Sequence, residues 1–187
     1  MGVQTKENEN FVYDQLALSN DFVYVPGYYF SADNTPNTRF LVKLDKSGNR
    51  VWTKSQFYAG MWGRCISILE NGDIAIGSGQ QNQGIIVVLD KNGIEKKRLE
   101  DLKFAPNEIT PTSDGGYIVT AIREIKPVPQ PLYVSSIWYD TELVAVKYKS
   151  DHTVEWRKTY DRYKNERGLD FVFSLKKGKI IVQAAMN

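Results

Sequence analysis

The stretch that decides the fold is LVKLDKSGNRVW, residues 41–52. Apolar and polar side chains largely alternate at its start, a polar turn with one glycine follows, and Val51 and Trp52 resume the apolar pattern. Alternation with a period of two predicts a half-buried β-strand, and glycine supplies the positive φ that a tight hairpin turn requires. The stretch therefore predicts a β-hairpin whose turn begins at Asp45.

The same hairpin is written twice more along the chain. VVLDKNGIEKK (residues 87–97) follows about 45 residues later, and AVKYKSDHTVEW (residues 145–156) keeps the tryptophan but has lost the glycine. A different hairpin recurs between these copies, at residues 15–27, 66–78, 108–121 and 171–184. Its turns carry Asn-Asp, Asn-Gly, Gly-Gly or Lys-Gly between short β-rich runs, as hairpin turns do.

Two hairpins per repeat make four short strands in roughly 40–50 residues, which is typical of β-propeller blades. We name the strands of one blade A, B, C and D. No apolar pattern with a period of 3.6 residues occurs, so we expect almost no helix. The predicted fold is all-β, built from blades of four antiparallel strands.

The repeat also predicts the domain organisation. We expect a polar N-terminal tail over residues 1–12 and a single propeller-type domain over 13–187, with blades at roughly 13–62, 63–106 and 107–168 and a half blade at 169–187. Closed propellers have four or more blades. About three and a half blades therefore predict either a fragment of a longer propeller or a propeller completed by assembly with a second chain, and the mass in solution tests both.

The repeats resemble those of a known group of proteins. SDGGYIVTA (residues 113–121) followed by LVAVKYKSDHTVEWRKTYD (residues 143–161) is similar to the SDGGYIVxG and VKLDxxGNxxW repeats of bacterial β-propeller proteins. LDKSGNRVWTK (residues 44–54) resembles the blade motif of quinoprotein-like (PQQ-like) propellers. The resemblance covers most of residues 13–184 and implies a propeller, a tryptophan that packs between neighbouring blades, and a secreted or cell-surface location.

The chain departs from that pattern at three positions. Lys97 stands where the tryptophan is expected, and Lys149 and His152 replace the turn aspartate and the turn glycine. No set of residues suits a quinone, so we expect no cofactor. The activities of proteins that share a fold are mixed, so the resemblance carries no specific activity.

Composition and charge exclude several classes of protein. Hydrophobic residues make up 42% of the 187 residues and aromatic residues 12%, which argues against disorder. The net charge of +2, from 24 basic and 22 acidic residues, lacks the basic excess typical of nucleic-acid binding. No apolar run is long enough to span a membrane, and the polar N-terminus lacks the apolar core of a signal peptide. The compartment stays open, because a chain that begins after a removed signal looks the same.

Three features could be mistaken for chemical sites. The Asp45 and Asp90 turns resemble calcium loops, but Lys46 and Lys91 interrupt the run of oxygen ligands, and an aspartate that bonds its own backbone explains both turns. Cys65, the single cysteine, lies in an apolar stretch where a buried thiol is expected. We therefore predict no metal site and no catalytic residue.

The candidate binding residues come from the connections between the hairpins. The A–B and C–D turns are tight, whereas the B–C connections (residues 27–38, 79–84 and 123–141) and the D–A connections (57–64, 101–107 and 160–168) look long and irregular. In a propeller these connections emerge at one end, and loops on a rigid scaffold often carry function. The candidate ligand-binding residues are Tyr28, Tyr29, Tyr58, Trp62, Arg64, Arg123, Tyr133, Trp138, Tyr139, Arg162 and Tyr163. Tyr, Trp and Arg dominate binding hot spots, although aromatic residues can equally cap the ends of blades.

Three functions fit these features. The first is a non-catalytic binding module that recognises a glycan, a peptide or a protein, with Gln80 to Gln83 able to bond sugar hydroxyls. The second is a quinoprotein-like or hydrolytic propeller enzyme, which would need convergent carboxylates such as Asp33, Asp140, Asp161 and Glu166. The third is a self-assembling structural repeat whose partner is another copy of the chain.

Overall fold

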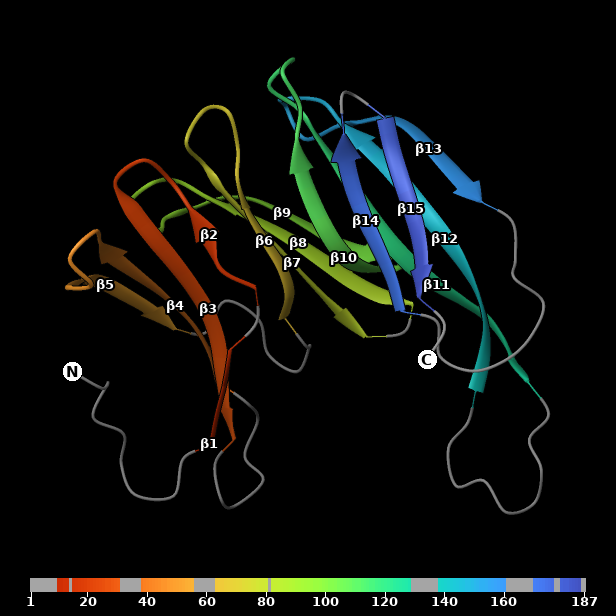
Figure 1. Cartoon of the computed structure of the whole chain (residues 1–187), viewed down its shortest axis with the longest axis horizontal. Helices are drawn as coiled ribbons and strands as arrows, with labels where there is room; N and C mark the ends of the chain where they lie inside the picture. Colours follow the sequence, from red (N-terminus) through yellow and green to blue (C-terminus); the bar gives the residue numbers. More distant parts are fainter. Residues whose placement is uncertain are drawn as a thin grey trace.

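The computed structural model describes residues 10–13, 15–30, 38–55, 63–80, 82–128, 138–160, 170–176 and 179–185. These residues form strands and turns, and no helix occurs among them (Figure 1). The described residues therefore contain no helix that could cross a membrane. The all-β class predicted from the hairpin repeat is confirmed.

Sheet one is the first of three stacked antiparallel sheets. It contains β1 (Asn10–Tyr13), β2 (Ala17–Leu18), β3 (Phe22–Phe30), β4 (Thr38–Asp45) and β5 (Arg50–Ser55). The strand order is β1-β3-β4-β5. Both β1 and β2 pair with β3: β2 pairs with Val23 and Tyr24, and β1 pairs with residues 27–30. The first edge of the sheet is therefore a strand in two pieces, and it includes residues 10–12, which the sequence placed in a polar tail.

Sheets two and three follow with four strands each, in sequence order. Sheet two contains β6 (Gly63–Ile68), β7 (Ile74–Gln80), β8 (Gln83–Leu89) and β9 (Glu95–Leu102). Sheet three contains β10 (Ala105–Pro111), β11 (Tyr117–Val128), β12 (Trp138–Tyr148) and β13 (Val154–Tyr160). The last two strands, β14 (Asp170–Lys176) and β15 (Lys179–Ala185), pair with each other. The predicted unit of four antiparallel strands is confirmed for these sheets.

The copies of the opening hairpin adopt one turn geometry. The backbone N–H of Asp45 bonds the carbonyl oxygen of Asn49 at 2.9 Å, and the equivalent bonds close the turns at Asp90 and Lys149. The fourth turn residue has positive φ in each copy: 80° at Gly48, 77° at Gly93 and 67° at His152. His152 therefore occupies a conformation that favours glycine, which explains why two of the three copies have glycine there.

Sheet two lies between sheets one and three, and its strands β7 and β8 are buried on both faces (Figure 1). Along β8, Ile85, Val87 and Leu89 pack with residues of sheet one, whereas Ile86 and Val88 pack with residues of sheet three. Successive side chains of a strand point to opposite faces. The unbroken apolar run from Ile85 to Leu89 is therefore the mark of a strand covered on both sides.

A tryptophan and a glycine meet between sheets one and two. Trp52 of β5 packs against the core between these sheets, and its Cη2 lies 3.2 Å from the point that a Cβ on Gly93 would occupy. Gly93 is the turn glycine of sheet two, so its missing side chain leaves room for the ring. The prediction that Trp52 is a wedge between sheets is confirmed. Trp156 occupies the same register position in sheet three, and its packing between blades stays a prediction.

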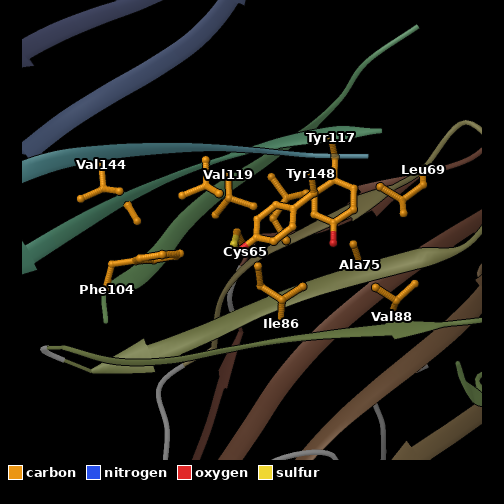
Figure 2. Close-up of a cluster of buried hydrophobic side chains, with 13 residues drawn as sticks. Cys65, Leu69, Ala75, Ile86, Val88, Phe104, Tyr117, Val119, Val144 and Tyr148 are labelled. Carbon is orange, nitrogen blue, oxygen red and sulfur yellow. The ribbon is translucent and has the colours of Figure 1, made fainter. Parts of the chain in front are cut away.

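Among the described residues, the core between sheets two and three has more buried members than the core between sheets one and two (Figure 2). Figure 2 shows Tyr117 and Tyr148 of sheet three directed toward Ala75 and Ile86 of sheet two. The buried members of this core are Cys65, Leu69, Ala75, Ile86, Val88, Phe104, Ile109, Tyr117, Val119, Ala121, Val144, Val146 and Tyr148. The predicted buried thiol at Cys65 is confirmed, with 2% of the residue exposed.

Two buried lysines are an unexpected feature of the core. Lys43 lies opposite Trp52, Lys147 lies opposite Trp156, and each lysine is only 6% exposed. Lys43 Nζ donates to the carbonyl oxygen of Lys91 in the next sheet at 3.0 Å, and burial lowers its pKa. Lys147 Nζ instead donates to the carboxylate of Asp114 at 2.9 Å. A buried ammonium group needs such partners, so both lysines hold neighbouring turns in place.

Candidate functional site

The strands of each sheet end on two sides, which we call the turn end and the connection end. The turn end carries the hairpin turns closed by backbone bonds at residues 45–49, 69–73, 90–94, 112–116 and 149–153. The connection end carries the other ends of the same strands, because neighbouring strands in these sheets are antiparallel. Figure 1 shows β3 and the pair β11–β12 projecting beyond sheet two at the lower edge, on opposite sides of it.

Several connections at this end are shorter than the sequence predicts. In sheet two, β7 and β8 stay paired up to Gln80 and Gln83, so four of the six residues predicted to form an irregular connection are paired strand residues. The prediction for residues 101–107 is also wrong, because β9 runs to Leu102 and β10 starts at Ala105. Long cross-strand pairing is the physical reason, since each further pair satisfies backbone hydrogen-bonding groups that a loop would leave to water.

The same extension changes the connections of sheets one and three. Strand β3 continues to Phe30, so Tyr28 and Tyr29 are paired strand residues opposite Arg39 and Thr38. Strand β11 continues to Val128, which pairs with Trp138, the first residue of β12. Pro127, expected in an irregular insert, pairs with Tyr139.

Six of the eleven predicted binding residues lie in the described strands. Tyr28 and Tyr29 are close to the end of β3, Arg64 is at the start of β6, and Trp138 and Tyr139 begin β12. These five positions are all at the connection end, although they come from three sheets. The sixth, Arg123, is further inside β11. The remaining candidates lie outside the described residues: Tyr58, Trp62, Tyr133, Arg162 and Tyr163.

Arg123 already has a partner within its own sheet. It pairs in register with Glu142 of β12, and its guanidinium forms an ion pair with that carboxylate. The Glu142 side chain is 13% exposed and the Arg123 side chain 38%. An arginine held in this way adds to the stability of the strand pair and is less able to bind an external anion.

The aspartates of the turn end act on their own backbone. Asp45 Oδ1 accepts hydrogen bonds from the backbone N–H groups of Ser47 and Asn49, at 2.9 and 2.8 Å. Asp90 accepts the equivalent pair of hydrogen bonds from the backbone N–H groups of Asn92 and Ile94. The pKa of Asp45 is lowered mainly by the hydrogen bond from the Asn49 side chain, and that of Asp90 mainly by the bond from the Ile94 N–H group. The interpretation of these turns as hairpin chemistry is confirmed. Among the described residues, no group of three or more His, Cys, Asp or Glu is arranged to hold a metal ion.

A cluster of aromatic rings fills the turn end between sheets two and three. Tyr117 and Tyr148 stack with their ring centroids 5.1 Å apart, and His152 lies with its centroid 5.9 Å from that of Tyr117. Burial raises the pKa of Tyr148 to about 12 and that of Tyr117 higher still. Tyr117 Oη and His152 Nδ1 are buried without a hydrogen-bond partner.

From the sequence, His152 stood out only as the replacement of the turn glycine, and the two tyrosines were not among the candidate residues. The available signal was their position next to the turns: Tyr117 directly follows the turn at residues 112–116, and Tyr148 directly precedes the turn at residues 149–153. The two tyrosines are paired in register and therefore lie on one face of the sheet. His152 is half-buried against that face. The charges of Asp73, Lys96 and Lys97 in sheet two also act on its ring.

The position of His152 predicts a pH dependence of stability. Burial is the largest cause that lowers the pKa of His152, and the nearby charges of Asp73, Lys96, Lys97 and Asp151 partly offset one another. The unfolded chain then binds a proton more readily than the folded chain, so stability falls as the pH drops through about 6.5. We expect a lower urea midpoint at about pH 5.5 than at about pH 7.5.

The matched variant is His152→Asn, because asparagine tolerates the left-handed conformation but does not titrate. No other histidine occurs in the chain. The difference between the two urea midpoints should therefore shrink in the variant. An equally large difference in His152→Asn would place the pH dependence elsewhere.

The fold defines an all-β protein of stacked antiparallel sheets, with aromatic and arginine positions at the connection end. No protein-family model matches the sequence, and neither does any curated protein. Among solved structures, the chain is similar to acylaminoacyl peptidase from Pyrococcus horikoshii, with a TM-score of 0.55 and 12% sequence identity. The match covers 89% of this chain but 26% of the peptidase. At this identity the similarity concerns the fold alone.

Proposed function

We propose that this chain is a non-catalytic β-propeller-type interaction module that binds a peptide, a protein or a glycan at its connection end. One observation carries the proposal: Tyr28, Tyr29, Arg64, Trp138 and Tyr139, which come from three sheets, all lie at the same end. Tyrosine, tryptophan and arginine are the residues that contribute most to binding energy at interfaces.

The stacked sheets support the scaffold part of this proposal. Each sheet covers one face of the next, and an apolar core fills both junctions. The similarity of the repeats to those of bacterial propeller proteins points the same way. A stiff stack of this kind holds strand ends at defined positions, and a binding surface needs such preorganisation.

The turn end supports the choice of the opposite end as the binding surface. Its polar groups are largely engaged: Asp45 and Asp90 bond their own turns, Asp114 pairs with Lys147, and Asp73 pairs with Lys96 at 2.6 Å. Side chains that satisfy one another in this way have less capacity left for a ligand.

Binding to glycan and peptide arrays tests the proposal. For a ligand found in this way, Trp138→Ala and Tyr139→Ala are expected to weaken binding by at least about tenfold each, measured by calorimetry. Ile94→Ala is the matched control, since Ile94 is an exposed apolar residue in a turn at the opposite end. Unchanged affinity in both aromatic variants, or loss of affinity in the control alone, would contradict the assignment of the binding end.

A further inference from the structure

The face of sheet one that points away from sheet two is apolar and open. Cross-strand pairs place Leu18 beside Val23, Val23 beside Leu44, and Val25 beside Val42 on this face. We call this the open face; its apolar members are Leu16, Leu18, Val23, Val25, Val42, Leu44 and Val51, which precedes the inward-facing Trp52. Leu16, Leu18 and Val51 are 57%, 67% and 49% exposed, which is unusual for large apolar side chains gathered on one sheet.

The equivalent face of each later sheet is covered within the chain. The residues of sheet two at the register positions of Val23, Val25, Val42 and Leu44 are Ile74, Ile76, Val87 and Leu89. All four are at most 2% exposed, because sheet one lies over them. In sheet three the equivalent residues are Tyr117, Val119, Val146 and Tyr148, which sheet two covers. The repeat thus shows twice that a β-sheet is the natural cover of this face.

We propose that the open face is a self-association surface on which a second copy of this chain packs through its own open face. Inside the chain, such residues are covered by the opposite face of the preceding sheet, which carries Lys43 in sheet one and Val88 in sheet two. The same face of sheet three carries Lys147, and these three residues are at most 6% exposed. Those faces are therefore not available in a second copy. The open face of that copy is available, and it offers aliphatic side chains of matching size.

The chemistry of the face suits a twofold contact between identical surfaces. Its seven apolar members are all aliphatic. The one charged residue that pairs onto this face is Arg50, opposite Leu44; it is exposed on the edge strand β5, where its guanidinium can stay in water when two copies meet. The rim next to it carries an exposed pair of opposite charges, Lys46 and Asp21, whose Nζ and Oδ1 atoms are 3.3 Å apart. A twofold axis can place the lysine of one copy near the aspartate of the other, as isologous interfaces do.

The size of the face sets the expected strength. Four strands about 4.8 Å apart and about 20 Å long span roughly 400 Å². Stable interfaces bury about 800 Å² on each partner, so this contact is expected to be weak, with a dissociation constant in the micromolar range. The mass must therefore be measured over a wide range of concentration.

Sedimentation velocity of the full chain from about 1 to about 500 µM tests the proposal. We expect the wild-type chain to shift from one to two copies over this range. Leu18→Lys and Val51→Lys are expected to stay monomeric throughout, because each would bury an unpaired charge in the contact. Val154→Lys is the matched control, since Val154 is 56% exposed in sheet three, and this variant should associate as the wild type does.

Three results would overturn the proposal. The first is a wild-type chain that stays monomeric at the highest concentration. The second is association that persists in the Leu18→Lys Val51→Lys double variant. The third is assembly that grows beyond two copies, because a closed twofold contact stops at a dimer. Thermal unfolding of each variant is measured alongside, and an unchanged midpoint shows that a monomeric variant is folded. The binding experiments at the connection end are independent of all these outcomes.

Discussion

Replacing Ile86 by alanine is expected to lower the free energy of unfolding by about 3–4 kcal/mol. Ile86 has no exposed surface and packs between sheets two and three, opposite the tyrosines of sheet three (Figure 2). The change removes buried apolar atoms and leaves a cavity between two rigid sheets that cannot close easily around it. Urea unfolding followed by tryptophan fluorescence and by circular dichroism measures the loss.

Ile94→Ala is the matched control for this variant. Ile94 belongs to the same sheet but lies in a turn and is 60% exposed. The same substitution there should change the free energy of unfolding by no more than about 0.5 kcal/mol. Similar losses in the two variants would mean that the interior between sheets two and three is not the close-packed core described above.

Replacing Gly84 by alanine is expected to cost about 3 kcal/mol of stability. A Cβ on Gly84 would overlap the carbonyl oxygen of Phe104 and approach Pro106 Cδ to 2.8 Å. Backbone cannot move aside as a flexible side chain can, so the junction between sheets two and three would have to shift. Thermal unfolding is expected to show a midpoint lower by roughly 6–12 °C.

Gly48→Ala separates this steric effect from the general cost of replacing glycine. Nothing lies within 4 Å of a Cβ on Gly48, and its φ of 80° imposes only the strain of a left-handed residue. That strain is worth about 1–2 kcal/mol. A larger loss for Gly48→Ala than for Gly84→Ala would contradict the close approach of Gly84 to Phe104.

The hairpins were predictable because their signals are local. Asp45 and Gly48 are three residues apart, and the turn that they form needs only a side-chain oxygen and a residue with positive φ. The alternation of apolar residues then follows from the period of a strand. The departure at His152 was visible in the sequence, but its contact with Tyr117 was not, because that contact depends on how the turn packs.

The ends of the strands were predicted less well. Residues 79–84 and 101–107 were predicted to be long and irregular connections between hairpins. In the structure the pairing of Gly79 with Gly84 continues the ladder of β7 and β8. Pairing is cooperative between strands, and a residue's own propensity says little about where it stops.

The sequence predicted at which end of the strands the candidate residues lie, but not which residues they contact. Tyr28 and Trp138 lie at the connection end, as expected from the order of the hairpins. The partner of Arg123 was not foreseen, because Glu142 is 19 positions away and meets it only through the register of β11 and β12. A one-residue slip in that register would place them on opposite faces.

The sequence by itself determined the repeating hairpins, their turns and the all-β class, because each depends on residues a few positions apart. Only the tertiary structure decided which faces are buried. The register positions of Val42 and Val87 are equivalent and both residues are valine, yet Val87 is fully buried while Val42 lies on the open face. The physical reason is that burial depends on the neighbouring sheet, and a strand carries the same alternation whether or not another sheet covers it.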